Sequence, residues 1–403
     1  MEVWDSIVIG AGQGGLAASY FLTQRGVDHV VLDANPVPGG AWQHRWDSLT
    51  MHDVHGVADL PGEPAPVRSD RRANDAVPAY FAGYERRHDL PLIRPVEVTE
   101  VTSEGDLLVV RAGDRVWRTR TLVNATGTWT RPNWPDYPGR EDFRGEQFHT
   151  ATYPGREHLR GKRILVVGAG ASAVQFIGEL APVADVAWAT RRPPRWRTGE
   201  FNPDAGLEVV TEVEKRVVAG LPPTSVVGVT GLMLREQEEE ARLLGAFDDP
   251  LPMFERLEAH GARWADGTLE PFDVILWATG FRSAVDHLDP LDLPGPLGGI
   301  PLERVDRNVQ GATTAARDHR VHPVGYGPSA STIGASRAAR RAALEVSRQV
   351  AQPQCGSTPS SPEVDRVLRR SLRSAGRGGG ARPRSPWDSW VRRGAAAPPA
   401  PRR

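Results

Sequence analysis

The chain has 403 residues, with 49 Lys plus Arg against 50 Asp plus Glu, a formal net charge of −1, and one cysteine. A single cysteine, Cys355, excludes an internal disulfide, a redox-active cysteine pair and a cysteine-rich metal site within one chain. The sequence has no apolar run near the ~20 residues that a membrane-spanning helix needs, and its first residues lack the order of a secretory signal. We therefore expect a cytoplasmic protein of about two or three domains.

The first predicted strand, residues 6–10, ends in a glycine-rich turn. Residues 10–15 read Gly-Ala-Gly-Gln-Gly-Gly, and an apolar segment of helical period follows. In such a turn the first glycine permits the bend, the second lets the backbone approach a pyrophosphate, and the third lets the helix pack on the strand. We therefore predict that Gly10, Gly12, Gly14 and Gly15 bind a dinucleotide, whose phosphates lie at the helix N-terminus.

The next predicted strand ends at Asp33. A carboxylate at this position accepts hydrogen bonds from a ribose diol and disfavours a 2′-phosphate. Asp33 is thus predicted to select the nucleotide of the first unit, and a solvated turn carboxylate is the alternative interpretation.

The same pattern recurs in a second unit. A strand at residues 164–168 leads into Gly168, Gly170 and Ala173, and the following strand ends at Arg191. The spacing from first glycine to selecting residue is the same in both units, 10 to 33 and 168 to 191. Arg191 and Arg192 are suited to the 2′-phosphate of NADP, and an arginine-rich surface turn is the alternative.

Each unit then reaches an Ala-Thr-Gly sequence after an apolar strand, at residues 125–127 and 278–280. Both units have a glycine-rich turn, a charged residue at the end of the next strand and an Ala-Thr-Gly sequence, in the same order. This predicts an α/β fold with two Rossmann-like dinucleotide-binding domains in tandem, each built on a parallel sheet. Opposite nucleotide preferences imply two dinucleotides on one chain, a flavin dinucleotide in the first unit and NADPH in the second.

The remaining segments carry weaker signals. Residues 201–260 form an insertion with apolar patches of helical character at 226–234 and 243–254, which we expect to pack mainly against the sheet. A helix is expected at 334–349, followed by a basic, disordered tail. We expect no membrane or nucleic-acid partner for the protein, and a homodimer stays open. For the basic tail, contact with nucleic acid, with an acidic partner or with the acidic folded body is the alternative to a non-functional extension.

Three further motifs point to a family. They are the spaced set Phe143, Gly145, His149 and Tyr153, the loop at residues 39–42 with Gly40 and Trp42, and the aromatic-flanked segment at residues 277–281. With these motifs the sequence resembles the flavin-containing monooxygenases that bind FAD and NADPH on one chain, including Baeyer–Villiger and N-hydroxylating relatives. The resemblance covers residues 7–350.

The resemblance implies an NADPH domain inserted into the FAD domain, with FAD parts at 1–152 and 282–350, the NADPH domain at 153–281 and a disordered tail at 351–403. The implied FAD-binding residues are Gly10, Gly12, Gly14, Gly15, Asp33, Gly40, Trp42, Ala125, Thr126, Gly127, Gly325 and Tyr326. The implied NADPH-binding residues are Gly168, Gly170, Ser172, Ala173, Arg191, Arg192, Thr279 and Gly280. Phe143, Gly145, His149 and Tyr153 would couple the two domains.

The implied activity is a monooxygenase reaction. NADPH would reduce FAD, oxygen would add to give a flavin C4a-(hydro)peroxide, and one oxygen atom would pass to a small organic substrate. His52 is the candidate catalytic residue, because it stands in a segment where many family members place an asparagine beside the flavin. A packed structural histidine is the alternative. His52, Asp53 and His55 predict no metal site, because neighbours on an extended segment point in alternate directions.

Other functions stay open at this stage. An NAD(P)H-dependent flavoprotein reductase that passes electrons to a partner and a non-catalytic cofactor-binding sensor are the alternatives. No residue matches the arginine of Baeyer–Villiger members, and the coupling motif ends in Tyr153 instead of Trp or Phe, which favours heteroatom oxygenation over ketone insertion. The sequence does not identify the substrate.

Overall fold

The computed structural model describes residues 2–54, 57–197, 213–223, 231–303, 312–330 and 332–352. These residues belong to one compact unit, Met1–Pro353. The expectations for His55, Cys355, residues 226–230 and the tail beyond residue 352 lie outside the described residues. In the part of the chain that is described, no helix combines the length and the apolar character that a bilayer crossing requires.

The first sheet has seven strands in the order β3-β2-β1-β6-β5-β4, with β15 beside β6. Its strands are β1 Val3–Ile9, β2 His29–Leu32, β3 Leu92–Ile93, β4 Glu100–Glu104, β5 Leu107–Ala112, β6 Arg115–Asn124 and β15 Val321–Pro323. Strand β1 pairs in parallel with β2 and β6, β2 with β3, and β15 with β6. Strands β4, β5 and β6 form an antiparallel meander. The predicted strand at residues 6–10 is confirmed as the buried end of β1.

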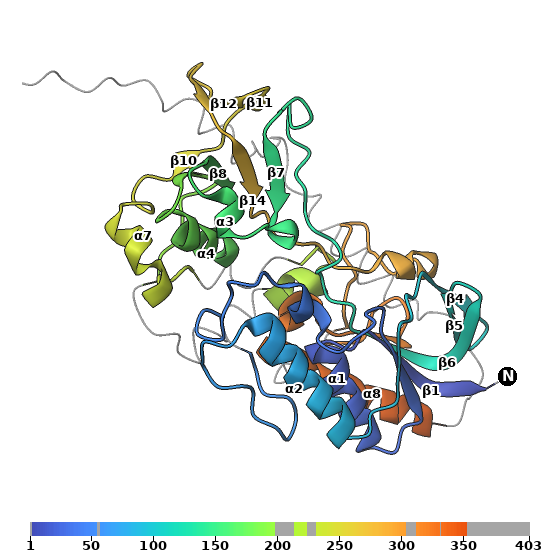
Figure 1. The fold of residues 1–403 in the computed structure, drawn as a ribbon. Coiled ribbons are helices and arrows are strands. Elements are labelled where there is room, and N and C mark those ends of the chain that lie inside the picture. The colour runs from blue at the N-terminus through green and yellow to red at the C-terminus, as the bar shows by residue number, and fades with distance from the viewer. Residues whose placement is uncertain are drawn as a thin grey trace, which may run out of the picture. The chain divides into compact units, whose positions relative to one another are not determined.

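Helices α1 (Gln13–Thr23) and α8 (Thr332–Ala351) lie side by side against this sheet, with α2 (Ala73–Arg87) nearby (Figure 1). The α8 face toward the core consists largely of alanine, with Ala338, Ala339, Ala342 and Ala343 all buried. Residues at this spacing share one side of a helix, and their small side chains allow α1 to approach closely. The helix expected at 334–349 is confirmed, and it extends by two residues at each end.

The second sheet has five parallel strands in the order β10-β9-β8-β14-β7. They are β7 Glu146–His149, β8 Arg163–Val167, β9 Asp185–Thr190, β10 Leu251–Pro252 and β14 Val274–Trp277. Helices α3 (Arg156–Leu159), α4 (Ala171–Leu180) and α7 (Glu239–Leu243) accompany it (Figure 1). A small antiparallel sheet follows, formed by β11 Arg256–Glu258, β12 Gly261–Arg263 and β13 Leu269–Pro271.

The chain order confirms an insertion. The chain leaves the first sheet after β6, completes the second sheet, and returns to the first sheet at β15, which pairs with the end of β6. Strand β7 belongs to the second sheet through its pairing with β14, although the expected domain boundary at residue 152 would assign it to the first domain. Phe143 explains this placement, because its side chain is buried in the core of the second sheet with Trp277.

The apolar patch at 243–254 is not a helix. Helix α7 ends at Leu243, and β10 covers Leu251–Pro252. Gly245 has a positive φ of 75° and Pro250 follows two aspartates, so the segment turns where a helix would need regular backbone. Its Phe247 and Phe254 are buried, which agrees with the expected packing role.

Short 3-10 helices complete the fold. They are η1 Gly40–His44, η2 Thr150–Thr152, η3 Glu236–Glu238, η4 Asp286–Leu291 and η5 Gly327–Ser329. The segment that begins at the end of η1 and the segment that begins with η2 both line the candidate site.

Candidate functional site

The first glycine-rich turn has the close contacts that its sequence requires. Gly10 has a positive φ of 96°, and a Cβ atom there would lie 2.6 Å from the Ala125 carbonyl oxygen. A Cβ on Gly15 would lie 1.8 Å from the Gly10 carbonyl oxygen, so helix and strand are too close for any side chain. A Cβ on Gly12, by contrast, would meet nothing within 4 Å. Open space therefore lies beside Gly12, at the start of α1.

The α1 N-terminus is free to hold an anion. Gly12 is its N-cap and supplies no side-chain cap, and the first turn contains no acidic residue. The unpaired amides of a helix start bind phosphate well. The loop with Gly39 and Gly40 packs against this point, since a Cβ on Gly40 would lie 2.9 Å from Gly12 Cα. The predicted residues Gly12 and Gly40 are thus brought together.

Asp33 is buried at the end of β2, with 3% of its surface exposed. Its Oδ2 atom lies 3.2 Å from Arg94 Nη2 in an ion pair and has no hydrogen-bond partner in the described structure. Arg94 also pairs with Glu85 at 2.7 Å. Because Asp33 keeps acceptor capacity in a buried place, it fits the predicted ribose-binding role, and it is not a solvated turn carboxylate.

The first Ala-Thr-Gly follows β6 and is held by hydrogen bonds. Asn124 Nδ2 donates to Thr126 Oγ1 at 3.0 Å, and His287 Nε2 donates to Asn124 Oδ1 at 2.7 Å. Burial lowers the pKa of His287 to about 4, and the neighbouring Asp286 only partly offsets this. A neutral His287 therefore fixes the segment at residues 124–127 beside Gly10.

The predicted FAD residues Gly325 and Tyr326 lie after β15. Their amides both donate to Ser329 Oγ at 3.0 Å, and the Tyr326 hydroxyl accepts from the Ile300 amide at 2.8 Å. The Tyr326 side chain therefore packs in the first domain's core. A Cβ on Gly325 would meet nothing within 4 Å, so open space adjoins the backbone at that residue.

The second glycine-rich turn repeats the geometry of the first. A Cβ on Gly168 would lie 2.3 Å from the Ala278 carbonyl oxygen, whereas a Cβ on Gly170 would meet nothing within 4 Å. Helix α4 starts after Gly170 without a side-chain cap or an acidic first turn. Ala173 is fully buried at the position of the third glycine. Ser172 lies in the first turn of α4, so the predicted pyrophosphate residues are together.

Arg191 and Arg192 directly follow β9 and are both exposed. Neither makes a hydrogen bond or ion pair with the residues that the structure describes. Free guanidinium groups at the end of this strand are available for a 2′-phosphate. The two units therefore present opposite charges at matching positions.

His149 links the end of β7 to the second Ala-Thr-Gly. Its Nδ1 accepts from the Ala151 amide at 3.1 Å, so the proton is on Nε2, which donates to the Gly280 carbonyl at 3.0 Å. Burial lowers the pKa of His149, with a partial offset from the Gly280 hydrogen bond. The Thr279 hydroxyl also donates to the Asn133 carbonyl, at 2.6 Å. His149 is thus a buried neutral side chain and not a solvated loop histidine.

Aromatic rings follow the two chain segments that connect the sheets. Phe281 stacks on Trp129 at 5.0 Å and meets His149 edge-on at 5.0 Å. The Arg45 guanidinium lies 4.6 Å from the Trp129 ring and 5.4 Å from the Trp42 ring. The predicted flavin-loop residue Trp42 and the coupling residue His149 therefore belong to one aromatic group.

The segment after η1 docks on helix α4. The Trp46 ring lies 4.9 Å from Phe176 and 6.0 Å from Tyr153, and Ser48 Oγ donates to Glu179 at 2.7 Å. Burial raises the pKa of Glu179. Tyr153, the last residue of the coupling motif, thus lies where the segment after η1 meets α4.

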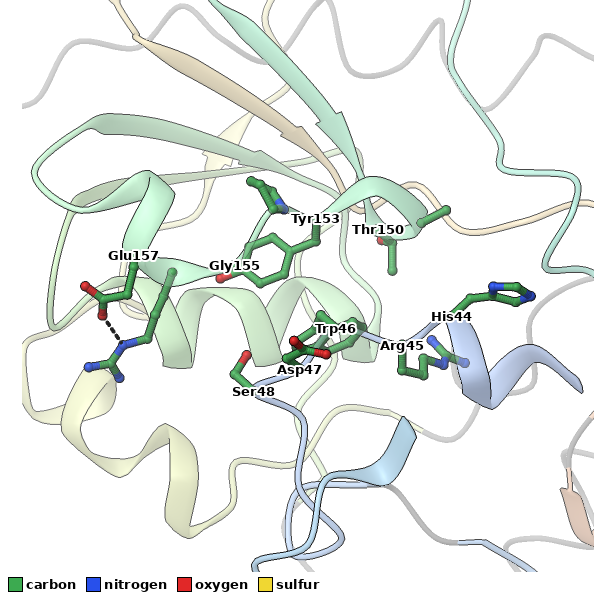
Figure 2. A pocket seen from close by; sticks show the side chains of 12 residues that line it. His44, Arg45, Trp46, Asp47, Ser48, Thr150, Tyr153, Gly155 and Glu157 are labelled. Atoms are coloured by element: carbon green, nitrogen blue, oxygen red, sulfur yellow. Dashed lines mark hydrogen bonds and ion pairs between the residues drawn. The ribbon is translucent and has the colours of Figure 1, made fainter. Parts of the chain in front are cut away.

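A cavity of about 410 Å³ lies beside this contact (Figure 2). Residues 44–48 form one wall, and residues 150–151 and 153–157 form the facing wall. Arg45 and Trp46 come from the first wall and Thr150 and Tyr153 from the second, as Figure 2 shows. The cavity is within the usual size range of small-molecule sites.

His52 lies away from these residues. Its side chain is 53% exposed, and its Nε2 atom lies 3.7 Å from Asp70 Oδ1. No contact in the described structure joins His52 to the glycine-rich turns, so its catalytic role stays a prediction. Among the described residues there is no group of three His, Cys, Asp or Glu side chains that would hold a metal ion.

Sequence reasoning did not find Arg45, Arg94 or Thr150. Arg45 stands between Trp42 and Trp46, three residues after the flavin loop, which is the one local signal that would have singled it out. Arg94 and Thr150 carry no such signal, because their importance depends on partners far along the chain.

Comparison with known proteins places this geometry in a family. Residues 7–221, just over half of the chain, match the family model described as pyridine nucleotide-disulphide oxidoreductase. The solved structure of a flavin-containing monooxygenase from Stenotrophomonas maltophilia is 35% identical, with a TM-score of 0.74, and the match covers 87% of this chain and all of that one.

Curated relatives agree with this placement. Indole-3-pyruvate monooxygenase YUCCA1 of Oryza sativa subsp. japonica is 27% identical over 334 residues, which cover 70% of this chain and 79% of the relative. The uncharacterized oxidoreductase CzcO of Bacillus subtilis is 29% identical over 182 residues, 44% of this chain. In that match the chain spans about half of the relative's length, 52%.

Proposed function

The chain belongs to the pyridine nucleotide-disulphide oxidoreductase family and, within it, to the flavin-containing monooxygenases, and from this we propose that it is an FAD- and NADPH-dependent monooxygenase that transfers one oxygen atom to a small organic substrate. One observation carries the proposal. The two glycine-rich turns share one backbone geometry, but the strand that follows each turn leads into a residue of opposite charge, Asp33 in the first unit and Arg191 in the second. The two units therefore suit two different dinucleotides.

FAD is assigned to the first unit. The open space at Gly12 and the uncapped start of α1 fit its pyrophosphate, and the buried Oδ2 of Asp33 fits its ribose. The packing of Gly40 on Gly12 places Trp42 and the loop around it on the same side. Bound FAD would supply the redox chemistry, accepting hydride from NADPH and activating oxygen.

NADPH is assigned to the second unit. Gly170 and the start of α4 hold its pyrophosphate, and Arg191 pairs with its 2′-phosphate, with Arg192 in support. The predicted partners Thr279 and Gly280 lie at the carboxyl end of β14, where ligands of parallel sheets bind.

The side chains between the two units position the domains. His149 holds Gly280 with its Nε2 proton, and Tyr153 and Trp46 pack the first domain against α4. Their burial excludes water from this contact. His149 has a positioning role and transfers no proton, because its neutral form makes both of its hydrogen bonds.

Coupling measurements test the proposal. FAD-loaded protein is given NADPH in air with a panel of thioethers, amines and ketones, while NADPH consumption, oxygen uptake and peroxide release are recorded. We expect slow NADPH oxidation with peroxide release, and one compound class that accelerates consumption while peroxide falls. Oxygen-insensitive NADPH consumption with an electron acceptor would indicate a reductase, and no NADPH oxidation would indicate a cofactor-binding sensor.

A further inference from the structure

The cavity between residues 44–48 and 150–157 contains a charge that the protein itself does not neutralise. Arg45 Nε is buried and has no hydrogen-bond partner in the described structure. The described residues also provide Arg45 with no ion pair, and its guanidinium lies over the faces of Trp42 and Trp129. Ring faces attract a cation weakly compared with a carboxylate.

The acidic side chains at the cavity are already engaged. Asp47 pairs with Arg72 at 3.4 Å and accepts from Asn74 at 2.8 Å. Glu157 pairs with Arg160 at 2.7 Å and with Arg156 at 3.2 Å. The described residues therefore supply no counter-ion for Arg45, which lies on the wall formed by residues 44–48.

The environment of Arg45 differs from that of Arg94, another partly buried arginine. Burial alone lowers the pKa of Arg45 to about 10, so it is charged at neutral pH without a compensating carboxylate. The carboxylates Glu85 and Asp33 overcome the burial of Arg94 and raise its pKa. An uncompensated buried charge is costly unless a ligand supplies the opposite charge.

A second unused donor lies on the facing wall. Thr150 is 2% exposed, and its Oγ1 atom is buried without a hydrogen-bond partner in the described part of the chain. Buried hydroxyl groups are nearly always paired, so an unpaired one that lines a cavity points to a ligand. Figure 2 shows Thr150 and Arg45 on opposite walls of the same cavity.

We propose that Arg45 and Thr150 bind the carboxylate of an organic substrate whose apolar body lies against Trp46 and Tyr153. A planar guanidinium matches a carboxylate through two parallel hydrogen bonds, and the threonine hydroxyl adds a third. Burial raises the pKa of Tyr153, so this ring is neutral and does not repel the anion. The pyrophosphates have their own sites at the starts of α1 and α4, so neither needs Arg45 as its counter-ion. The inference rests on the proposed function.

The test uses two matched probes, para-(methylthio)benzoate and its methyl ester, which share the oxidisable thioether and differ only in charge. Binding to FAD-loaded full-length protein is measured by calorimetry, and oxygenation is measured separately as sulfoxide formed with NADPH. We expect the acid to bind at least ~10-fold more tightly than the ester. Arg45→Gln should abolish this preference, Arg45→Lys should keep part of it, and Thr150→Val should weaken acid binding by about 3- to 10-fold.

Arg242→Gln is the matched control, because it removes an arginine that already has a partner, Glu239, and neither residue lines the cavity. It should leave the preference for the acid unchanged. The inference is overturned if Arg45→Gln weakens the acid and the ester equally, if it weakens FAD or NADPH binding instead, or if the wild-type protein does not prefer the acid. Arg45-dependent acid binding without sulfoxide formation would support the site and contradict the proposed function.

Discussion

The glycine-rich turns of the two units have nearly the same backbone, and two positions that bear on nucleotide binding differ between the units. Gly10 and Gly168 both press against the carbonyl oxygen of the alanine in an Ala-Thr-Gly sequence, at 2.6 and 2.3 Å from an added Cβ. Gly12 and Gly170 both face open space. The differences are Gly15 against Ala173 and buried Asp33 against exposed Arg191. The shared backbone suits any pyrophosphate, and the strand-end side chain selects the nucleotide.

A histidine supports each of the two Ala-Thr-Gly segments, but in different ways. In the first unit His287 holds the side chain of Asn124, and in the second His149 holds the backbone of Gly280. Burial lowers the pKa of both histidines. The two units should therefore both weaken in acid, and substitutions in either unit can show which one fails first.

The largest effect is expected from Gly15→Ala. The added methyl group would lie 1.8 Å from the Gly10 carbonyl oxygen, so α1 must move away from β1. Overpacking of this kind costs roughly 3 kcal/mol. We expect FAD binding to weaken by more than ~100-fold, measured as the flavin absorbance of the purified protein. The matched variant Ala173→Gly removes the corresponding methyl group in the second unit and should keep its FAD. Full flavin content in Gly15→Ala would contradict the close contact.

Acid should destabilise the protein through His287. Because its folded-state pKa is depressed, its contribution is present above pH 6.5 and is lost as the pH falls toward about 4. The shift corresponds to roughly 3 kcal/mol. His322, whose pKa burial also lowers to about 4, adds a similar loss. His287→Gln, which keeps an N–H donor but does not titrate, should reduce the acid-induced loss of unfolding free energy by up to about 3 kcal/mol. Identical acid profiles for the variant and the wild-type protein would exclude this role.

Arg191→Ala should change nucleotide preference. Loss of a charge-assisted hydrogen bond to the 2′-phosphate costs about 1.5–3 kcal/mol, so the KM for NADPH should rise by roughly 10- to 100-fold. The KM for NADH should stay the same, because NADH lacks the phosphate. Arg192→Ala is the control and should have a smaller effect. Equal rises for both nucleotides would show that Arg191 does not read the phosphate.

The smallest effect is expected from His149→Ala. The variant loses the hydrogen bond to Gly280, which contributes about 1 kcal/mol, and loosens the contact between the domains. We expect peroxide release per NADPH to rise by roughly 3- to 10-fold, in line with a weakened link of that size. His149→Gln retains an N–H donor and should recover part of the coupling. Unchanged peroxide release in His149→Ala would contradict its positioning role.

Much of this organisation was predictable from local sequence signals. The strands before Gly10 and Gly168, the two turns and the long alanine-rich helix depend on residues close together in the chain, and each was confirmed. The inserted order of the second domain followed from the family resemblance, and the return of β15 to β6 confirmed it.

Features that depend on distant contacts were not predictable. The membership of β7 in the second sheet depends on its pairing with β14, more than a hundred residues later. The pairing of Asp33 with Arg94 and the missing counter-ion of Arg45 depend on which side chains the fold brings together. A sequence shows that an arginine is present but does not show whether a carboxylate will neutralise it.

The most direct test of the central claim follows the oxygen atoms. FAD-loaded protein and NADPH turn over the best substrate of the panel under isotopically labelled dioxygen, and the product is analysed by mass spectrometry. A monooxygenase places one labelled atom in the product and the other in water. An unlabelled product, with all the label in hydrogen peroxide, would show that the chain reduces oxygen without transferring it to a substrate.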